Sequence, residues 1–199
     1  MEVALRKERY RTLNISYPSR RGDLGSLAQF IDRRLAQADI WITSERVHFV
    51  THSMGGLVAA RYLHDFSDRI PAGKVGRVVM LAPPSKGSEL ADFLSRFLPY
   101  RWLYGPAGRE LTTTVRGETE TLPYYEVGVI AGTTGWPYIL GSALIQKPHD
   151  GRVAVERTIM DGMKDHLILL ATHTFIAWKP AVHRQVIHFL KDGAFERVE

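Results

Sequence analysis

The 199-residue sequence contains no cysteine. This absence excludes disulfide scaffolds, thiolate metal sites and a cysteine nucleophile, and it leaves the redox compartment open. The sequence also lacks any apolar run close to the roughly 20 residues that a membrane-spanning helix needs. Its first ten residues carry too many charges for a secretory signal peptide. We therefore expect no integral membrane segment and a cytoplasmic location.

Runs of basic residues are missing as well, although the formal net charge is +5. Lysines and arginines are scattered among acids, without the interleaved aromatic residues of RNA-binding sheets. Neither G-x-x-x-x-G-K-[ST] nor G-x-G-x-x-G follows an apolar segment, so a nucleotide-binding protein is the weakest alternative. The sequence predicts no nucleic-acid partner.

The composition, 45% hydrophobic and 24% charged, is typical of a globular protein. The length suits one domain, so we expect residues 1–199 to form a single unit. A chain of this size buries roughly 70% of its unfolded surface and needs no metal or disulfide for stability.

Apolar segments alternate with amphipathic ones along the chain. Strands are predicted at residues 11–17, 46–52, 75–82, 124–131 and 167–171, and helices near Val3, after Asp23, at 54–66 and from Pro180 to Gly193. This alternation predicts an α/β fold with a mainly parallel sheet and helices on both faces. Residues 93–122 interrupt the pattern and are expected to form an insertion or cap, whose aromatic residues either line an acyl pocket or cover the sheet.

The stretch HFVTHSMGGLVAARYL carries the most chemical information. A predicted strand runs into a predicted helix across five residues, Thr51-His52-Ser53-Met54-Gly55. This is the layout of a nucleophile elbow, G-x-S-x-G, with Thr51 at the first glycine position. Such a turn exposes the serine hydroxyl, and the following helix directs N–H groups at developing negative charge. His52 is expected to pack or hydrogen-bond locally. The alternative is that Ser53 only caps the helix.

A serine nucleophile needs a base and an acid that orients the base. With this elbow they follow in the order serine, acid, histidine. Asp150 comes after the predicted strand 124–131, and His173 comes after the predicted strand 167–171. Both would lie at the carboxyl ends of strands, the edge at which α/β sheets place their ligand sites.

Other acids and histidines compete for these roles. Asp161 and Asp165 are alternatives to Asp150, and His166 is an alternative to His173. Because Asp165 and His166 would enter a strand rather than leave one, we favour Asp150 and His173.

These features together resemble the α/β-hydrolase superfamily, and more narrowly its bacterial lipase- and esterase-like members. The family pattern P-x-x-G-S-x-x-A-D is matched from Pro84 to Asp92. The later pattern, D-G-x-V followed by a distant histidine, is matched from Asp150 to Val153 and by His173.

The resemblance implies a triad of Ser53, Asp150 and His173, with the Met54 N–H as one of two oxyanion donors. It implies no metal and no cofactor. Family members begin with a strand that leads into a His-Gly loop, which supplies the second donor, but no His-Gly pair precedes Ser53. By this resemblance we expect an N-terminally truncated fold, whose exposed sheet edge allows copies of the chain to associate.

The predicted activity is the hydrolysis of a small-molecule carboxylic ester through an acyl-enzyme intermediate. Two alternatives stay open. One is an acyltransferase that uses the same triad. The other is a non-catalytic or impaired relic of the fold, since loss of one oxyanion donor costs roughly 10²–10³ in rate.

Overall fold

The computed structural model describes residues 1–95, 107, 111, 123–145 and 147–197. Within these residues the helices, short 3-10 turns (η) and strands follow one another along the chain as helix α1 (Glu2–Lys7), α2 (Leu24–Gln37), α3 (Ile40–Thr43), β1 (Val47–His52), α4 (Met54–Asp65), η1 (Ser67–Arg69), β2 (Val75–Leu81), α5 (Glu89–Ser95), β3 (Val127–Gly132), α8 (Ile139–Leu144), η2 (Val155–Thr158), β4 (Asp165–Leu169), η3 (Ile176–Trp178) and α9 (Pro180–Asp192).

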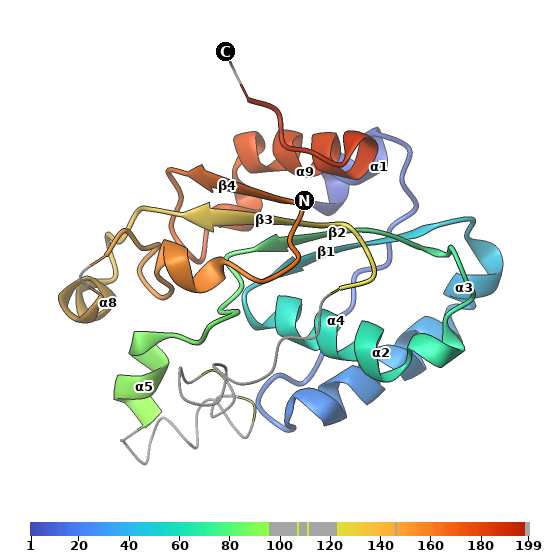
Figure 1. The fold of residues 1–199 in the computed structure, drawn as a ribbon, viewed down its shortest axis with the longest axis horizontal. Coiled ribbons are helices and arrows are strands. Elements are labelled where there is room, and N and C mark those ends of the chain that lie inside the picture. The colour runs from blue at the N-terminus through green and yellow to red at the C-terminus, as the bar shows by residue number, and fades with distance from the viewer. Residues whose placement is uncertain (96–106, 108–110, 112–122, 146, 198–199) are drawn as a thin grey trace.

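The described strands form one parallel sheet in the order β1-β2-β3-β4 (Figure 1). Parallel neighbours require crossover connections, and α4 makes the crossover from β1 to β2. All strands therefore end at the same edge of the sheet. The predicted α/β fold with a parallel sheet is confirmed.

Helices cover both faces of this sheet. Helices α2 and α4 pack on one face, and α1 and α9 lie on the other (Figure 1). The inward face of α2 follows helical periodicity, because Leu24, Leu27, Ile31 and Leu35 are all buried. The strands are accordingly apolar toward both helical layers.

The helix ends carry the signals that the sequence predicted. The Asp23 carboxylate accepts a hydrogen bond from the Ser26 N–H at 2.7 Å and caps α2. Pro180 begins α9, where its missing N–H costs nothing. Gly193 ends that helix with φ 76°, a left-handed conformation that glycine adopts without strain.

Several strand predictions need correction. Residues 11–17 form no strand, since none of them is hydrogen-bonded to a described strand in a ladder. The strand expected at 167–171 is β4, Asp165–Leu169, because its pairing with β3 starts at Asp165. The strand expected at 124–131 is β3, which begins three residues later. The predicted insertion, 93–122, lies mostly outside the described residues.

No helix in the described ranges is long and apolar enough to cross a membrane.

Candidate active site

Ser53 lies in a strained turn directly after β1. Its backbone angles are φ 54° and ψ −131°, a region that non-glycine residues seldom occupy and that costs about 1–3 kcal/mol. Two backbone hydrogen bonds hold the turn. The Ser53 N–H donates to the Leu81 carbonyl at 2.8 Å, and the Gly56 N–H donates to the Ser53 carbonyl at 3.0 Å. Sheet and helix together therefore fix this serine at the edge where the strands end.

The small residues of the turn have unequal importance. A Cβ added to Gly56 would lie 3.1 Å from the Met80 sulfur and 3.2 Å from the Pro83 Cβ, which is tight. A Cβ on Gly55 would make only ordinary contacts, the nearest at 3.4 Å from the Tyr17 hydroxyl. The close approach between helix and sheet is therefore at Gly56. Thr51, which stands at the first glycine position of the motif, would lie no closer than 3.4 Å to a Cβ added at Gly55 or Gly56.

The structure brings Ser53, His173 and Asp150 together, although up to 120 residues separate them in sequence. The Ser53 Oγ lies 2.8 Å from the Nε2 of His173. The Nδ1 of His173 lies 2.7 Å from the Asp150 Oδ2. The geometry fits a neutral imidazole that donates from Nδ1 to the carboxylate and accepts the serine hydroxyl proton at Nε2.

Asp150 is held rigidly in a buried loop. Only 1% of it is exposed, and its Oδ1 accepts hydrogen bonds from the N–H groups of Arg152 (3.0 Å) and Val153 (2.9 Å). Gly151 has φ 100°, and a Cβ there would collide with the ring of Tyr138. The Asp-Gly pair of the sequence motif thus has a physical reason, since only glycine permits this turn.

His52 contacts the backbone and the ring of His173. Its Nε2 lies 2.8 Å from the backbone carbonyl of His173, and the two rings lie 5.1 Å apart. Burial, followed by the nearby His173, lowers the pKa of His52 to about 4. His52 is therefore neutral near pH 7 and donates its Nε2 proton to that carbonyl. The sequence indicated a local role for His52, but nothing in it revealed this contact across 121 positions.

The Met54 amide begins α4 beside Ser53. It donates no hydrogen bond within the described part of the chain, so its N–H is available to a ligand. It also lies at the positive end of a 12-residue helix. This is the position at which an anionic oxygen bound next to the Ser53 hydroxyl would be stabilised.

The competing acids and histidine lie elsewhere. Asp165 begins β4, where it pairs with Arg197 and accepts from the Phe195 N–H. The Arg197 guanidinium holds the pKa of Asp165 below its usual value. His166 contacts the Thr158 hydroxyl at 3.0 Å, and Asp161 is paired with Lys86. The structure therefore joins neither Asp165, Asp161 nor His166 to Ser53.

Tyr138 and Thr174, the residue after His173, form a hydrogen-bonded pair that the sequence did not predict. The Tyr138 hydroxyl is hydrogen-bonded to the Thr174 hydroxyl and accepts from the Thr174 N–H. Trp136, two positions before Tyr138, is 79% exposed. No group of three metal-binding side chains occurs among the residues that the structure describes.

Comparison with known proteins gives matches of two kinds. The model of the alpha/beta hydrolase family matches residues 2–189. No curated protein matches the sequence. Among solved structures, the mature form of the lipase BlEst2 from Bacillus licheniformis is similar, with a TM-score of 0.63 and 20% identity over 83% of this chain and 76% of that one.

Two further structures are similar at lower coverage of their own length. Phospholipase PlaB from Legionella pneumophila, in complex with thio-NAD, has a TM-score of 0.67 and 15% identity over 90% of this chain and 50% of that one. A metagenomic carboxyl esterase has a TM-score of 0.59 and 20% identity over 83% of this chain and 55% of that one. At these identities the likeness supports the fold, and the chain spans only about half the length of these two proteins.

Proposed function

This chain belongs to the alpha/beta hydrolase family, and from that premise we propose that it is a serine hydrolase that cleaves carboxylic esters. The observation that carries the proposal is the continuous hydrogen-bond chain from the Ser53 hydroxyl through His173 to Asp150, with links of 2.8 and 2.7 Å. The structural neighbours are a lipase, a phospholipase and a carboxyl esterase, which supports an ester as substrate.

In the proposed acylation step, the Ser53 Oγ attacks the ester carbonyl carbon while His173 Nε2 takes the hydroxyl proton. Asp150 accepts the Nδ1 proton of His173 in a hydrogen bond and stabilises the imidazolium that forms. The carbonyl oxygen becomes an oxyanion and accepts from the Met54 N–H. As the intermediate collapses, the bond to the alcohol oxygen breaks and His173 delivers its proton to that oxygen.

Deacylation repeats this sequence with water as the nucleophile. His173 takes a proton from water, the hydroxide attacks the acyl-serine carbonyl, and the proton returns to the Ser53 Oγ. The acid leaves and the free enzyme is restored. If an alcohol takes the place of water, the same groups transfer the acyl chain, so analysis of products with added alcohol distinguishes transfer from hydrolysis.

His52 is a positioning residue in this proposal. Its Nε2–H donates to the His173 backbone carbonyl at 2.8 Å and so fixes the peptide that carries the base. It touches neither the substrate nor the reacting atoms. Because His52 stays neutral down to about pH 4, it adds no positive charge beside the imidazolium that forms during attack.

A fluorophosphonate probe tests the nucleophile directly, since it phosphonylates an activated serine. The wild-type protein should be labelled on the peptide that contains Ser53, and Ser53→Ala should not be labelled. Ser67→Ala, which removes an exposed hydroxyl far from the turn, is the matched control and should react like the wild type. Labelling that persists in Ser53→Ala, or a wild type that never reacts, would contradict the proposal.

A further inference from the structure

Arg152 is a half-buried arginine in the loop that carries Asp150. Its N–H donates to the Asp150 Oδ1 at 3.0 Å, and its carbonyl accepts a hydrogen bond from the buried Ser88 hydroxyl at 2.7 Å. The backbone of Arg152 is therefore fixed on both sides, two positions after the acid of the proposed triad. Its side chain starts from an anchored position at the edge where the strands end.

The side chain of Arg152 extends over the ring of Tyr138. The guanidinium carbon lies 5.5 Å from the ring centre, within the roughly 6 Å at which an aromatic face attracts a cation. Tyr138 is itself held by Thr174, since its hydroxyl donates to the Thr174 hydroxyl and accepts from the Thr174 N–H. Because Thr174 follows His173 directly, the guanidinium and the ring lie beside the segment that carries the proposed base.

Arg152 differs from the other half-buried arginines in its lack of a carboxylate partner. Among the arginines that the structure describes, Arg77 and Arg157 are also half-buried. Arg77 pairs with Glu126 at 2.5 Å, and Arg157 pairs with Glu89 at 2.9 Å. The Arg152 guanidinium forms neither an ion pair nor a hydrogen bond with any described residue. Since a charge that has lost part of its hydration is stabilised by a partner, these donors are available to a ligand.

Asp150 is the acid nearest to Arg152 in sequence, but its carboxylate is already occupied. Its Oδ1 accepts the N–H groups of Arg152 and Val153, and its Oδ2 faces His173 at 2.7 Å. The positive charge of Arg152 nevertheless acts within the site. Burial is the largest cause of the lowered pKa of His52, and the charge of Arg152 lowers it further. The guanidinium is therefore close enough to influence a charged group bound near the proposed base.

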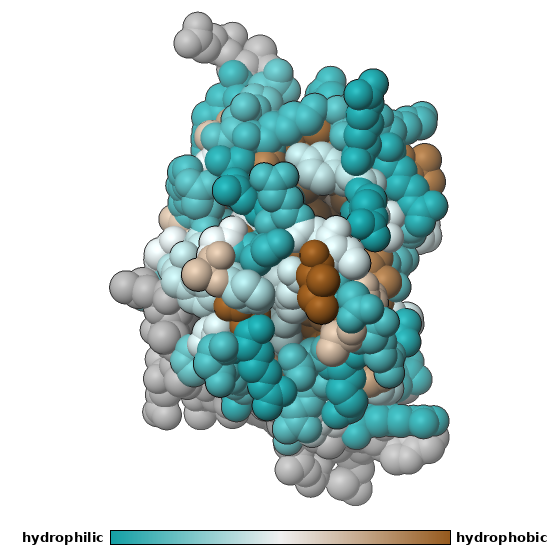
Figure 2. All heavy atoms as spheres, turned by 90° about the vertical axis from the view of Figure 1, so that its right-hand side faces the viewer, coloured by the Kyte–Doolittle hydropathy of each residue, from teal (hydrophilic) through white to brown (hydrophobic). Residues whose placement is uncertain are grey.

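Exposed arginines elsewhere on the protein have no such meaning. Arg33 on α2 and Arg46 before β1 are exposed, so water solvates their charges. The face at the amino ends of the strands is largely hydrophilic (Figure 2), as expected for solvated charges. Arg152 lies at the carboxyl ends instead, beside the proposed triad.

We propose that Arg152 binds an anionic oxygen group, a carboxylate or a phosphate, carried by the ester that Ser53 cleaves. One face of the guanidinium lies against Tyr138, so its in-plane N–H groups remain free for the paired hydrogen bonds that carboxylates and phosphates accept. The ring and the anchored backbone restrict the side chain before a ligand binds, which lowers the entropic cost of binding. Arg152 is thus a specificity-determining residue for negatively charged esters. This assignment rests on the proposed ester hydrolysis and adds a class of substrate to it.

Two pairs of esters, each differing chiefly in charge, test the assignment. The first pair is 4-nitrophenyl hydrogen adipate and its methyl ester, which places a carboxylate in the acyl part. The second pair is 1-butyrylglycerol 3-phosphate and 1-butyrylglycerol, which places a phosphate in the alcohol part. Within at least one pair, kcat/KM should be about tenfold higher for the anionic member, and this preference should decline as the salt concentration rises. The pair that shows it identifies the part of the ester that carries the charge.

Substitution of Arg152 tests whether this residue is the cause of the preference. Arg152→Gln should lower the anionic-to-neutral ratio of kcat/KM about tenfold, because it removes the charge-assisted hydrogen bonds. Arg152→Lys keeps the charge without the planar fork and should retain part of the preference. Arg33→Gln, which removes an exposed arginine on α2, is the matched control and should keep the wild-type ratio. If Arg152 only stabilised the loop of Asp150, Arg152→Gln would lower both rates equally and leave the ratio unchanged.

A binding measurement separates the assignment from the proposed activity. Ser53→Ala cannot form the acyl-enzyme, so it can be titrated with monomethyl adipate and with dimethyl adipate while NMR follows the Arg152 Nε–H signal. The anionic ester should shift this signal with a dissociation constant about tenfold lower than that of the neutral ester. In Arg33→Gln combined with Ser53→Ala, the same difference should remain.

Three results would overturn the assignment. They are cleavage of the esters with no charge preference in either pair, a preference that Arg152→Gln leaves intact, and an Arg152 signal that monomethyl adipate does not shift. If none of the esters is cleaved but monomethyl adipate still shifts the signal, the anion site is supported and the proposed ester hydrolysis fails.

Discussion

The carboxyl ends of the strands and the open edge of β1 lie only a few residues apart, yet they differ in how their polar groups are satisfied. At the strand ends, the Asp150 carboxylate accepts two backbone N–H groups and faces His173 at 2.7 Å. Along β1, the outward backbone groups of Val50 and His52 have no backbone partner in the described chain.

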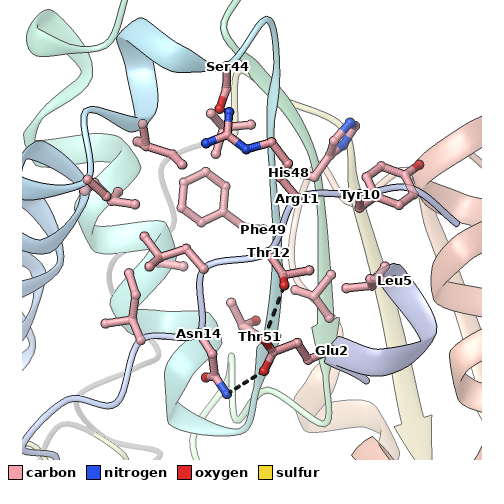
Figure 3. Close-up of a pocket in the computed structure, with 18 of the residues that line it drawn as sticks. Glu2, Leu5, Tyr10, Arg11, Thr12, Asn14, Ser44, His48, Phe49 and Thr51 are labelled. Atoms are coloured by element: carbon pink, nitrogen blue, oxygen red, sulfur yellow. Dashed lines mark hydrogen bonds between the residues drawn. The ribbon is translucent and has the colours of Figure 1, made fainter. Parts of the chain in front are cut away.

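The two regions also differ in how closely their atoms pack, which is tighter at the strand ends than along β1. A Cβ on Gly132, at the end of β3, would collide with the Ala171 carbonyl and lie 2.9 Å from the Asp150 Cβ. By contrast, a cavity of about 1020 Å³ lies beside Val50 and Phe49 of β1 (Figure 3). The difference teaches that residues of this chain pack closely around Asp150, whereas the described residues leave a cavity beside β1. Changes at the two places should therefore have different consequences.

The largest effect is expected from Asp150→Asn. An amide in place of the carboxylate keeps the size but favours the wrong tautomer of His173, because it can donate to Nδ1. By the behaviour of such triads, kcat/KM for p-nitrophenyl acetate should fall about 10⁴-fold. Steady-state kinetics measure this, and thermal unfolding checks that the variant remains folded.

Asp165→Asn is the control for that prediction, since Asp165 pairs with Arg197 at the start of β4 and lies away from Ser53. It should retain kcat/KM within about threefold. A loss in Asp165→Asn comparable to that in Asp150→Asn would break the distinction between the two acids.

Much of this arrangement could be predicted from the sequence. Chain order and the rule that strands end at one edge were enough to select Asp150 and His173 over Asp165 and His166 as candidates. The strand predicted at 11–17 was wrong because local pattern reports strand propensity, whereas a strand also needs a neighbour to pair with. The contact of His52 with the His173 carbonyl could not be predicted, because it depends on the packing of two loops that are distant in sequence.

The pH dependence of stability should give the next largest effect. Burial lowers the pKa of His52 from 6.5 to about 4, and it also lowers the pKa of His48 and of His166. The unfolded chain takes up a proton near pH 6.5 that folded His52 excludes until about pH 4. The free energy of unfolding is therefore highest above pH 6.5 and falls as the pH drops toward 4, by up to about 3 kcal/mol for His52.

His52→Gln tests this dependence, because glutamine retains an N–H donor for the His173 carbonyl but does not titrate. Urea unfolding between pH 7 and 4.5 should show a shallower loss of stability than in the wild type. His64→Gln is the control, since the His64 side chain is 59% exposed. If His52→Gln and the wild type lose stability in parallel, the buried neutral state of His52 is wrong.

The smallest effect comes from a pair of substitutions that each add carbon atoms, one at the strand ends and one in the cavity beside β1. Gly132→Ala forces the Ala171 carbonyl or Asp150 to move, and overpacking of this kind costs about 1–3 kcal/mol. Ala59→Leu adds three carbons where α4 lines this cavity, so it should be neutral or should stabilise by up to about 1 kcal/mol. Chemical denaturation measures both.

The decisive result is which of the two substitutions lowers the free energy of unfolding more, rather than the exact size of either change. If Ala59→Leu destabilises the fold as much as Gly132→Ala does, the space beside β1 is not available to an occupant and the two regions are packed alike. If Ala59→Leu is neutral or stabilising while Gly132→Ala is destabilising, the difference in packing between the two regions is supported.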